Sequence, residues 1–192
     1  RMVFEAGPMS PPLLRKSWYK ASLITASYGH GIAIAPLQFA SAVAAVLNGG
    51  HIIKPTLIKR LDEIDEQQGK TVVTAQTTRQ MATLFRQNVA GTDGTGERAD
   101  VPGFAVGGKT GTADRAINGG YDRKSVIASF LGAFPMNDPR FLTFVLLFDP
   151  KGFGETNGAR TASTNAAPVT ARLVARIASQ LGVAPQKVTA TQ

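Results

Sequence analysis

The sequence predicts an α/β fold of the α+β type, in which an antiparallel sheet is flanked by helices. Two apolar runs, at residues 125–134 and 141–148, have the length of strands. A short turn at residues 135–139 joins them, so they should be antiparallel neighbours. Other stretches show helical periodicity, with apolar residues recurring on one face. The chain has 192 residues, 43% of them apolar, which is enough to bury one core.

The first half of the chain is predicted to be mainly helical. A short helix over residues 18–25 should lead into a glycine loop. Pro36 suits the first turn of a second helix, which the glycine pair at 49–50 ends. Because this helix is apolar nearly all round, it is expected to be buried. A strand is expected at residues 54–64, followed by a turn at residues 66–70.

The second half is predicted to contain the sheet. A helix over residues 78–90 should precede a loop rich in glycine and threonine at residues 91–96. Three strands are expected, at residues 104–113, 125–134 and 141–148. A final helix has an apolar stripe made of Val169, Leu173, Ile177 and Leu181. Gly182 closes this helix.

The most informative segment is Gly-Gly-Lys-Thr-Gly-Thr-Ala at residues 107–113. In an extended strand successive side chains face opposite ways, so Thr110 and Thr112 should share one face and Lys109 and Gly111 the other. Two hydroxyls on one face can bind a carboxylate. Gly111 leaves room for a peptide to pair alongside the strand. The segment therefore indicates a site for an anionic, peptide-like ligand.

The same residues also fit the phosphate-binding loop G-x-x-x-x-G-K-[ST], from Gly103 to Thr110. Residues 144–149 resemble the apolar strand that ends in a magnesium-binding aspartate. That mechanism requires a helix directly after Thr110, because its N-terminal amides bind the phosphate. Gly111 and the Asn-Gly-Gly sequence at 118–120 follow instead, where a helix is not expected. Nucleotide binding remains the alternative interpretation.

Three further stretches carry a family resemblance. Residues 27–40, Ser-Tyr-Gly-His-Gly-Ile-Ala-Ile-Ala-Pro-Leu-Gln-Phe-Ala, resemble the glycine loop and T-P-L-Q-x-A helix of class B penicillin-binding proteins, with Ala35 where that family usually has threonine. Residues 107–113 resemble the K-T-G-T strand of the family, and residues 121–150 its next two strands. The Ser-Tyr-Gly-His-Gly loop is most similar to the cell-division branch, with an elongation-type relative as the alternative.

The resemblance implies a serine-type peptidoglycan D,D-transpeptidase, which cross-links stem peptides by acyl transfer and is the target of β-lactams. It implies that the catalytic residues of this chain are Lys109, Thr110, Gly111 and Thr112, and that these, with Ala113, bind substrate. Lys109 would stabilise charge near the serine of an S-x-N motif. The two threonine hydroxyls would bind the terminal carboxylate, and the N–H of Thr112 would be the second donor of the oxyanion hole.

The family carries its chemistry on three motifs in the order S-x-x-K, S-x-N and K-T-G. Residues 17–20 spell S-x-x-K, but such a string is expected by chance, and it lies immediately ahead of the glycine loop. Residues 163–165 spell S-x-N, but they follow the K-T-G strand. We therefore expect residues 1–183 to be the C-terminal part of a transpeptidase domain, an incomplete fold without its nucleophile and inactive alone. Residues 184–192 are expected to be a flexible tail.

Composition restricts the partners. The formal charge is +8, but Lys and Arg never run beyond adjacent pairs, so no nucleic-acid stripe is expected. A basic surface suits a cell-wall polymer rich in carboxylates or an anionic membrane face. The absence of cysteine excludes disulfides and thiolate metal sites, and the two histidines are far apart. No metal ion or cofactor is expected.

The resemblance also implies partners and a location. The partners are peptidoglycan stem peptides, their lipid-linked precursor, β-lactams, other divisome proteins and the N-terminal remainder of the protein. The location is the periplasmic face of the bacterial inner membrane, with the anchor outside this chain. A non-catalytic module that binds cell wall or a partner is a further alternative. Tyr28 and His30 are weaker candidates, at the rim of a cleft.

Overall fold

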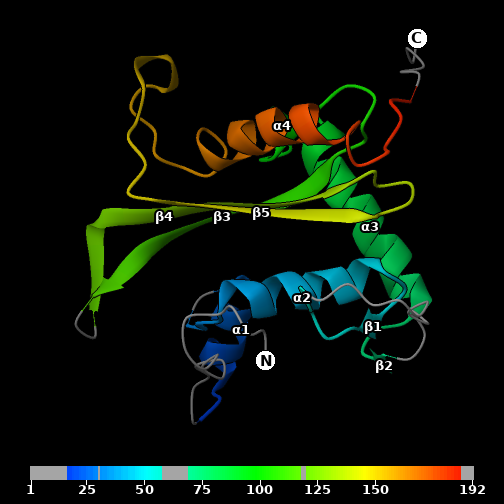
Figure 1. Ribbon diagram of the computed structural model, residues 1–192. Coiled ribbons are helices and arrows are strands. Elements are labelled where there is room, and N and C mark those ends of the chain that lie inside the picture. Colours follow the sequence, from blue (N-terminus) through cyan, green and yellow to red (C-terminus); the bar gives the residue numbers. More distant parts are fainter. Residues whose placement is uncertain (1–16, 30, 58–68, 118–119, 187–192) are drawn as a thin grey trace.

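The computed structural model describes residues 17–29, 31–57, 69–117 and 120–186. Its centre is a three-stranded antiparallel sheet with the order β3-β4-β5, made of β3 (Gly107–Ile117), β4 (Gly120–Phe134) and β5 (Phe141–Phe148). Helix α4 (Ala166–Ile177) covers one face of this sheet, and α2 (Pro36–Leu47) lies on the other (Figure 1). The predicted antiparallel sheet flanked by helices is confirmed.

The other elements lie beside this layered centre. Helix α1 (Lys20–Ser27) lies below α2 in Figure 1, farther from the sheet, and α3 (Ala75–Ala90) passes one end of the strands. Helix α3 begins before the predicted residue 78 because the Thr74 hydroxyl caps it, accepting the N–H of Thr77 at 3.1 Å. The remaining elements are the paired strands β1 (His51–Ile52) and β2 (Lys70–Thr71) and the 3-10 helices η2 (Glu97–Ala99) and η3 (Gly154–Thr156).

Several predicted strand boundaries are wrong. The strand expected at 104–113 begins only at Gly107, because residues before it form a turn in which Ala105 has a φ of 45°. β3 and β4 also extend farther than expected, because polar residues pair across the hairpin as far as Ile117 and Gly120. Residues 54–57 are not in a strand, whereas the rest of the predicted 54–64 strand and most of the 66–70 turn lie outside the described residues.

The main core lies between the sheet and α4. Phe130 and Phe134 of β4 are fully buried in it together with Val174 of α4. A smaller cluster on the opposite face contains Ala133 and Leu47 and packs against α2 and α3. Strand β4 is therefore buried on both faces, as a central strand should be.

Two helices bury different residues from those predicted. The predicted stripe of α4 is only partly buried: Ile177 packs against the core, whereas Leu173 remains 36% exposed, and Leu181, beyond the end of α4, 39%. The buried residues of α4 are Ala166, Ala167, Thr170 and Val174. A Cβ added to Gly132 would lie 3.2 Å from Thr170 Cγ2, so the helix lies too close to the sheet for large side chains at the contact. Helix α2 is also less buried than expected, since only Ala45 and Leu47 are buried among its residues.

The predicted tail begins inside the folded part of the chain. The N–H of Gln186 donates to the carbonyl of Gly103 at 2.7 Å. A Cβ on Gly103 would lie 3.0 Å from Cβ of Pro185. Residues 184–186 thus pack against the turn that leads into β3, and residues 187–192 lie outside the described residues.

Candidate functional site

Strand β3 lies at an edge of the sheet, and among the described residues no strand pairs with its outer side. On that side the carbonyl of Gly108 accepts a hydrogen bond from Nδ2 of Asn88 at 2.8 Å. The carbonyl of Gly111 points to the other side, toward β4, where it accepts a hydrogen bond from Oγ of Ser129 at 3.2 Å. In an antiparallel strand, the N–H and C=O of one residue point to the same side, and the side alternates along the chain. The backbone N–H of Thr112 therefore points to the open edge.

The ammonium group of Lys109 lies along this edge. Its side chain is exposed, and Nζ donates to the carbonyl of Thr110 at 2.9 Å and to the Thr110 hydroxyl at 3.3 Å. The side chain thus places a positive charge beside a hydroxyl and beside the outward-facing backbone. This combination suits an anionic ligand that lies along the strand.

Thr110 and Thr112 lie on the α4 face of the strand. Their register partners on β4 both belong to the core beneath α4. The Thr112 hydroxyl accepts the N–H of Ala162 at 3.1 Å, and the Thr110 hydroxyl lies 2.7 Å from that of Thr95. The structure thus brings both hydroxyls to one face of the strand and supports each from a different loop.

The two glycines around Lys109 and Thr110 have different surroundings. A Cβ on Gly108 would lie 2.5 Å from the carbonyl oxygen of Leu131 and 2.6 Å from the ring of Phe130, so no larger residue fits. A Cβ on Gly111 would meet only Oγ of Ser129, at 2.7 Å. The first glycine allows close packing, whereas the second keeps the strand free of a side chain.

Helix α3 and the loop after it hold the start of the strand. The guanidinium of Arg86 donates to the carbonyl of Val106 and forms an ion pair with Asp100 at 2.7 Å. Oδ1 of Asn88 accepts the Thr95 hydroxyl at 3.1 Å. The glycine- and threonine-rich composition of residues 91–96 indicates a loop, but nothing in the sequence indicates that Asn88 or Thr95 reaches β3.

The two other motif-like strings are not part of this arrangement. Ser17 and Lys20 are exposed at the start of α1, beyond α2 from the sheet (Figure 1). Asn165 is buried, and its amide donates to the carbonyls of Ala159 and Thr161, each at 3.3 Å. These bonds hold the turn before α4, which gives the S-x-N string at 163–165 a structural role.

The phosphate-loop interpretation is wrong. Lys109 and Thr110 lie inside β3, which continues beyond them, so no helix N-terminus follows to bind a phosphate. Asp149 stands where the phosphate-loop motif has its magnesium ligand. Its carboxylate accepts hydrogen bonds from the Ser125 hydroxyl at 2.6 Å and from the N–H of Val126 at 3.0 Å. These hydrogen bonds, that of Ser125 first, hold the pKa of the Asp149 carboxyl below its ordinary value of 3.8.

The glycine loop after α1 is described only in part. Tyr28 is 69% exposed at the end of that helix, and His30 lies outside the described residues. Gly29 and Gly31 have φ values of 88° and 80°, which favour glycine. The predicted place of this loop at the rim of a cleft stays a prediction.

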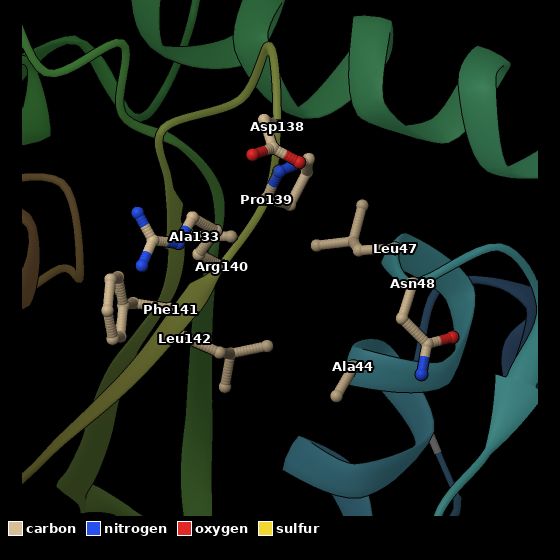
Figure 2. Close-up of a pocket in the computed structure, with 9 residues that line it drawn as sticks. All are labelled: Ala44, Leu47, Asn48, Ala133, Asp138, Pro139, Arg140, Phe141 and Leu142. Atoms are coloured by element: carbon tan, nitrogen blue, oxygen red, sulfur yellow. The ribbon is translucent and has the colours of Figure 1, made fainter. Parts of the chain in front are cut away.

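A cavity of about 650 Å³ lies away from the β3 site, between α2 and the β4–β5 turn. Figure 2 shows Leu47, the last residue of α2, and Asn48, the C-cap of that helix, on one side of the cavity, and Asp138 and Arg140 on the other. The guanidinium of Arg140 lies 5.4 Å from the centre of the Phe141 ring. None of the lining residues belongs to β3, so this cavity does not contribute to the Lys109 site.

Comparison with known families identifies the chain. Residues 6–175 match the model of the penicillin binding protein transpeptidase domain. The chain belongs to this family. It is 38% identical over 180 residues to the probable peptidoglycan D,D-transpeptidase FtsI of Caulobacter vibrioides, covering 90% of this chain and 30% of that protein. Stage V sporulation protein D of Bacillus subtilis is 33% identical over 172 residues, covering 85% of this chain and 26% of that protein.

Solved structures agree with this assignment. The transpeptidase domain of penicillin-binding protein 3 from Burkholderia pseudomallei superposes with a TM-score of 0.77 at 33% identity, covering 91% of this chain and 51% of that one. Penicillin-binding protein 3 of Mycobacterium tuberculosis, solved in complex with ampicillin, has the same fold, with a TM-score of 0.74 at 23% identity over 95% of this chain and 42% of that one. The chain is thus part of a class B transpeptidase domain of the FtsI and penicillin-binding protein 3 type. It spans between a quarter and a third of the length of these two curated relatives.

Proposed function

We propose that this chain supplies the K-T-G-T strand of a serine-type peptidoglycan D,D-transpeptidase. The observation that carries the proposal is the open edge of β3, where the ammonium of Lys109, the Thr110 hydroxyl and the backbone of Thr112 lie together. A peptide that ends in a carboxylate can pair with such an edge and place its terminal charge beside the lysine. The D,D-transpeptidase names of the relatives support the same reaction.

In the proposed reaction, a serine from another part of the protein attacks the penultimate D-Ala carbonyl of a stem peptide. The bond to the terminal D-Ala breaks, and the acyl group then passes to an amine of a neighbouring stem. Lys109 stabilises charge near the serine of an S-x-N motif, and the hydroxyls of Thr110 and Thr112 bind the terminal carboxylate. The outward N–H of Thr112 donates to the oxyanion. Gly111 and Ala113 line the path of the peptide.

β-Lactams bind at the same edge in this proposal, because their carboxylate and strained amide imitate the substrate. The ampicillin complex of the Mycobacterium tuberculosis protein supports this part. The further partners are the lipid-linked precursor, other divisome proteins and the N-terminal remainder of the protein, which carries the nucleophile and the anchor. The reaction takes place at the periplasmic face of the inner membrane. Among the described residues, no helix has the length and apolar character of a membrane span.

The test is acylation of the complete protein by a labelled penicillin. Lys109→Ala should reduce the acylation rate constant by about 100-fold or more, because a preorganised charge is lost from the site. Lys151→Ala is the matched control, since Lys151 is exposed after β5, and it should react like the wild type. Equal rates for Lys109→Ala and the wild type would remove the lysine from the mechanism. A wild type that takes no label would support the non-catalytic alternative.

The reaction product distinguishes the proposed transpeptidase from a related enzyme that hydrolyses its substrate. A carboxypeptidase or β-lactamase releases hydrolysed peptide or drug, whereas the proposed enzyme joins two stem peptides in the presence of an amine acceptor. The product is measured by mass spectrometry with synthetic stem peptides. Cross-linked dimer supports the proposal, and hydrolysed product alone contradicts it.

A further inference from the structure

A chain of hydrogen bonds connects α3 to the site through the loop at residues 91–96. Nδ2 of Asn88 donates to the Gly108 carbonyl at 2.8 Å, and Oδ1 of the same amide accepts the Thr95 hydroxyl at 3.1 Å. The Thr95 oxygen lies 2.7 Å from the Thr110 oxygen, which in turn lies 3.3 Å from Nζ of Lys109. Four side chains from a helix, a loop and a strand thus form one continuous path.

The direction of this path follows from Asn88. Its NH₂ group must face the Gly108 carbonyl, because a carbonyl oxygen cannot donate, so its own oxygen faces Thr95. The single proton of the Thr95 hydroxyl is therefore used toward Asn88. It follows that Thr110 donates to Thr95 and accepts from Lys109.

The two threonines of the site consequently differ before a ligand binds. Thr112 accepts the N–H of Ala162, which leaves its hydroxyl proton available for a carboxylate. The Thr110 proton is already directed to Thr95. Thr110 can donate to a carboxylate only if its proton leaves Thr95.

We propose that Thr95, oriented by Asn88, is a positioning residue that acts through Thr110: it holds the Thr110 proton and so limits how strongly Thr110 binds the substrate carboxylate. This inference rests on the proposed function. In the ligand complex, Thr110 turns its proton from Thr95 to the carboxylate, whereas Thr95 keeps its own bond to Asn88. Because Thr95 does not touch the ligand, its effect is confined to how well Thr110 binds the charged group.

The test compares two ligands in the complete protein, benzylpenicillin and its uncharged methyl ester. Thr95→Val removes the hydroxyl at nearly constant volume. It should raise the ratio of acylation rate constants, acid over ester, by about 3- to 10-fold, the range expected for one neutral hydrogen bond, because the Thr110 proton no longer has Thr95 as an acceptor. Thr95→Ser should restore the ratio. The matched control is Thr83→Val, which removes an exposed hydroxyl that donates to the Arg79 carbonyl of its own helix.

The outcomes separate the inference from the proposed function. A wild type that neither ligand acylates overturns the proposed function. An acylated wild type with an unchanged or lowered ratio in Thr95→Val overturns the inference alone. Equal losses for acid and ester indicate damage to the strand as a whole and also overturn the role in carboxylate recognition.

Discussion

The two halves of strand β3 have different surroundings. The first half contains Gly108 and Lys109, and it is held by α3, by the loop at residues 91–96 and by the segment before α4. The second half, from Ala113 to the hairpin tip, pairs with β4, and its described side chains at 113–115 are exposed. Arg115 of this half forms an ion pair with Asp149, directly after β5, at 3.9 Å.

This difference explains where a binding site can form on one continuous strand. A site needs groups that keep their geometry when a ligand arrives, and such groups are held by packing and by supporting hydrogen bonds. Within the part of the chain that the structure describes, the first half of β3 has this support, from both the core beneath it and the loops beside it, and the side chains at 113–115 do not. The pairing of β3 with β4 shifts register between Asp114 and Arg115, near the start of the second half.

The largest expected effect on stability comes from removing the core side chain that lies beneath the first half of β3. Phe130→Ala in the complete protein should lower the free energy of unfolding by about 3–5 kcal/mol, because the ring is fully buried under Thr110 and Gly108. Urea unfolding measures the change. Phe153→Ala is the control, since this side chain is 60% exposed, and it should cost less than about 1 kcal/mol. Equal costs would show that the core does not support the site.

Alanine substitutions at Gly108 and Gly111 compare two positions within the first half of β3. Gly108→Ala should cost about 1–3 kcal/mol, because the new methyl group would meet backbone and a buried ring that cannot move away. Gly111→Ala should cost about 1 kcal/mol or less, since only the Ser129 hydroxyl must rotate. Urea unfolding of both variants checks the order. The explanation of the two positions fails if Gly111→Ala is the less stable variant.

The smallest expected effect is on the melting temperature. It concerns Asp149, which pairs with Arg115 in the second half of β3, and it depends on pH. The folded-state pKa of Asp149 is lowered, chiefly by the Ser125 hydroxyl, so its ionised form stabilises the folded protein. That contribution is complete above about pH 5 and disappears as the pH falls through the lowered pKa. Asp149→Asn should therefore reduce the melting temperature slightly at pH 7, and the difference from the wild type should vanish in acid.

Asp138→Asn, at the exposed turn between β4 and β5, is the control for this measurement. Its melting temperature should match that of the wild type at pH 7, because the substitution lies on the exposed surface. A difference between the wild type and Asp149→Asn that persists unchanged in acid would show that the carboxylate charge is not what holds the end of the hairpin.

The order of the strands and the motif on β3 could be predicted because they depend on local patterns. The apolar run at 141–148 is the observed β5, and the alternation of residues 109–112 correctly places the two threonines on one face. The buried face of α4 could not be predicted in this way. Large apolar residues mark its sequence, but the close approach to Gly132 selects small ones.

What the sequence determined by itself is the three strands of the sheet, the main helices, the family and the order of chemical groups along β3, since each follows from residue type and spacing. What only the tertiary structure decided is which of these groups are supported and in which direction their hydroxyls donate. Asn88 and Thr95 reach the strand from a helix and a loop, at contacts separated by up to 20 residues in the chain. Such contacts arise when packing brings distant segments together, and no local pattern in the sequence records them.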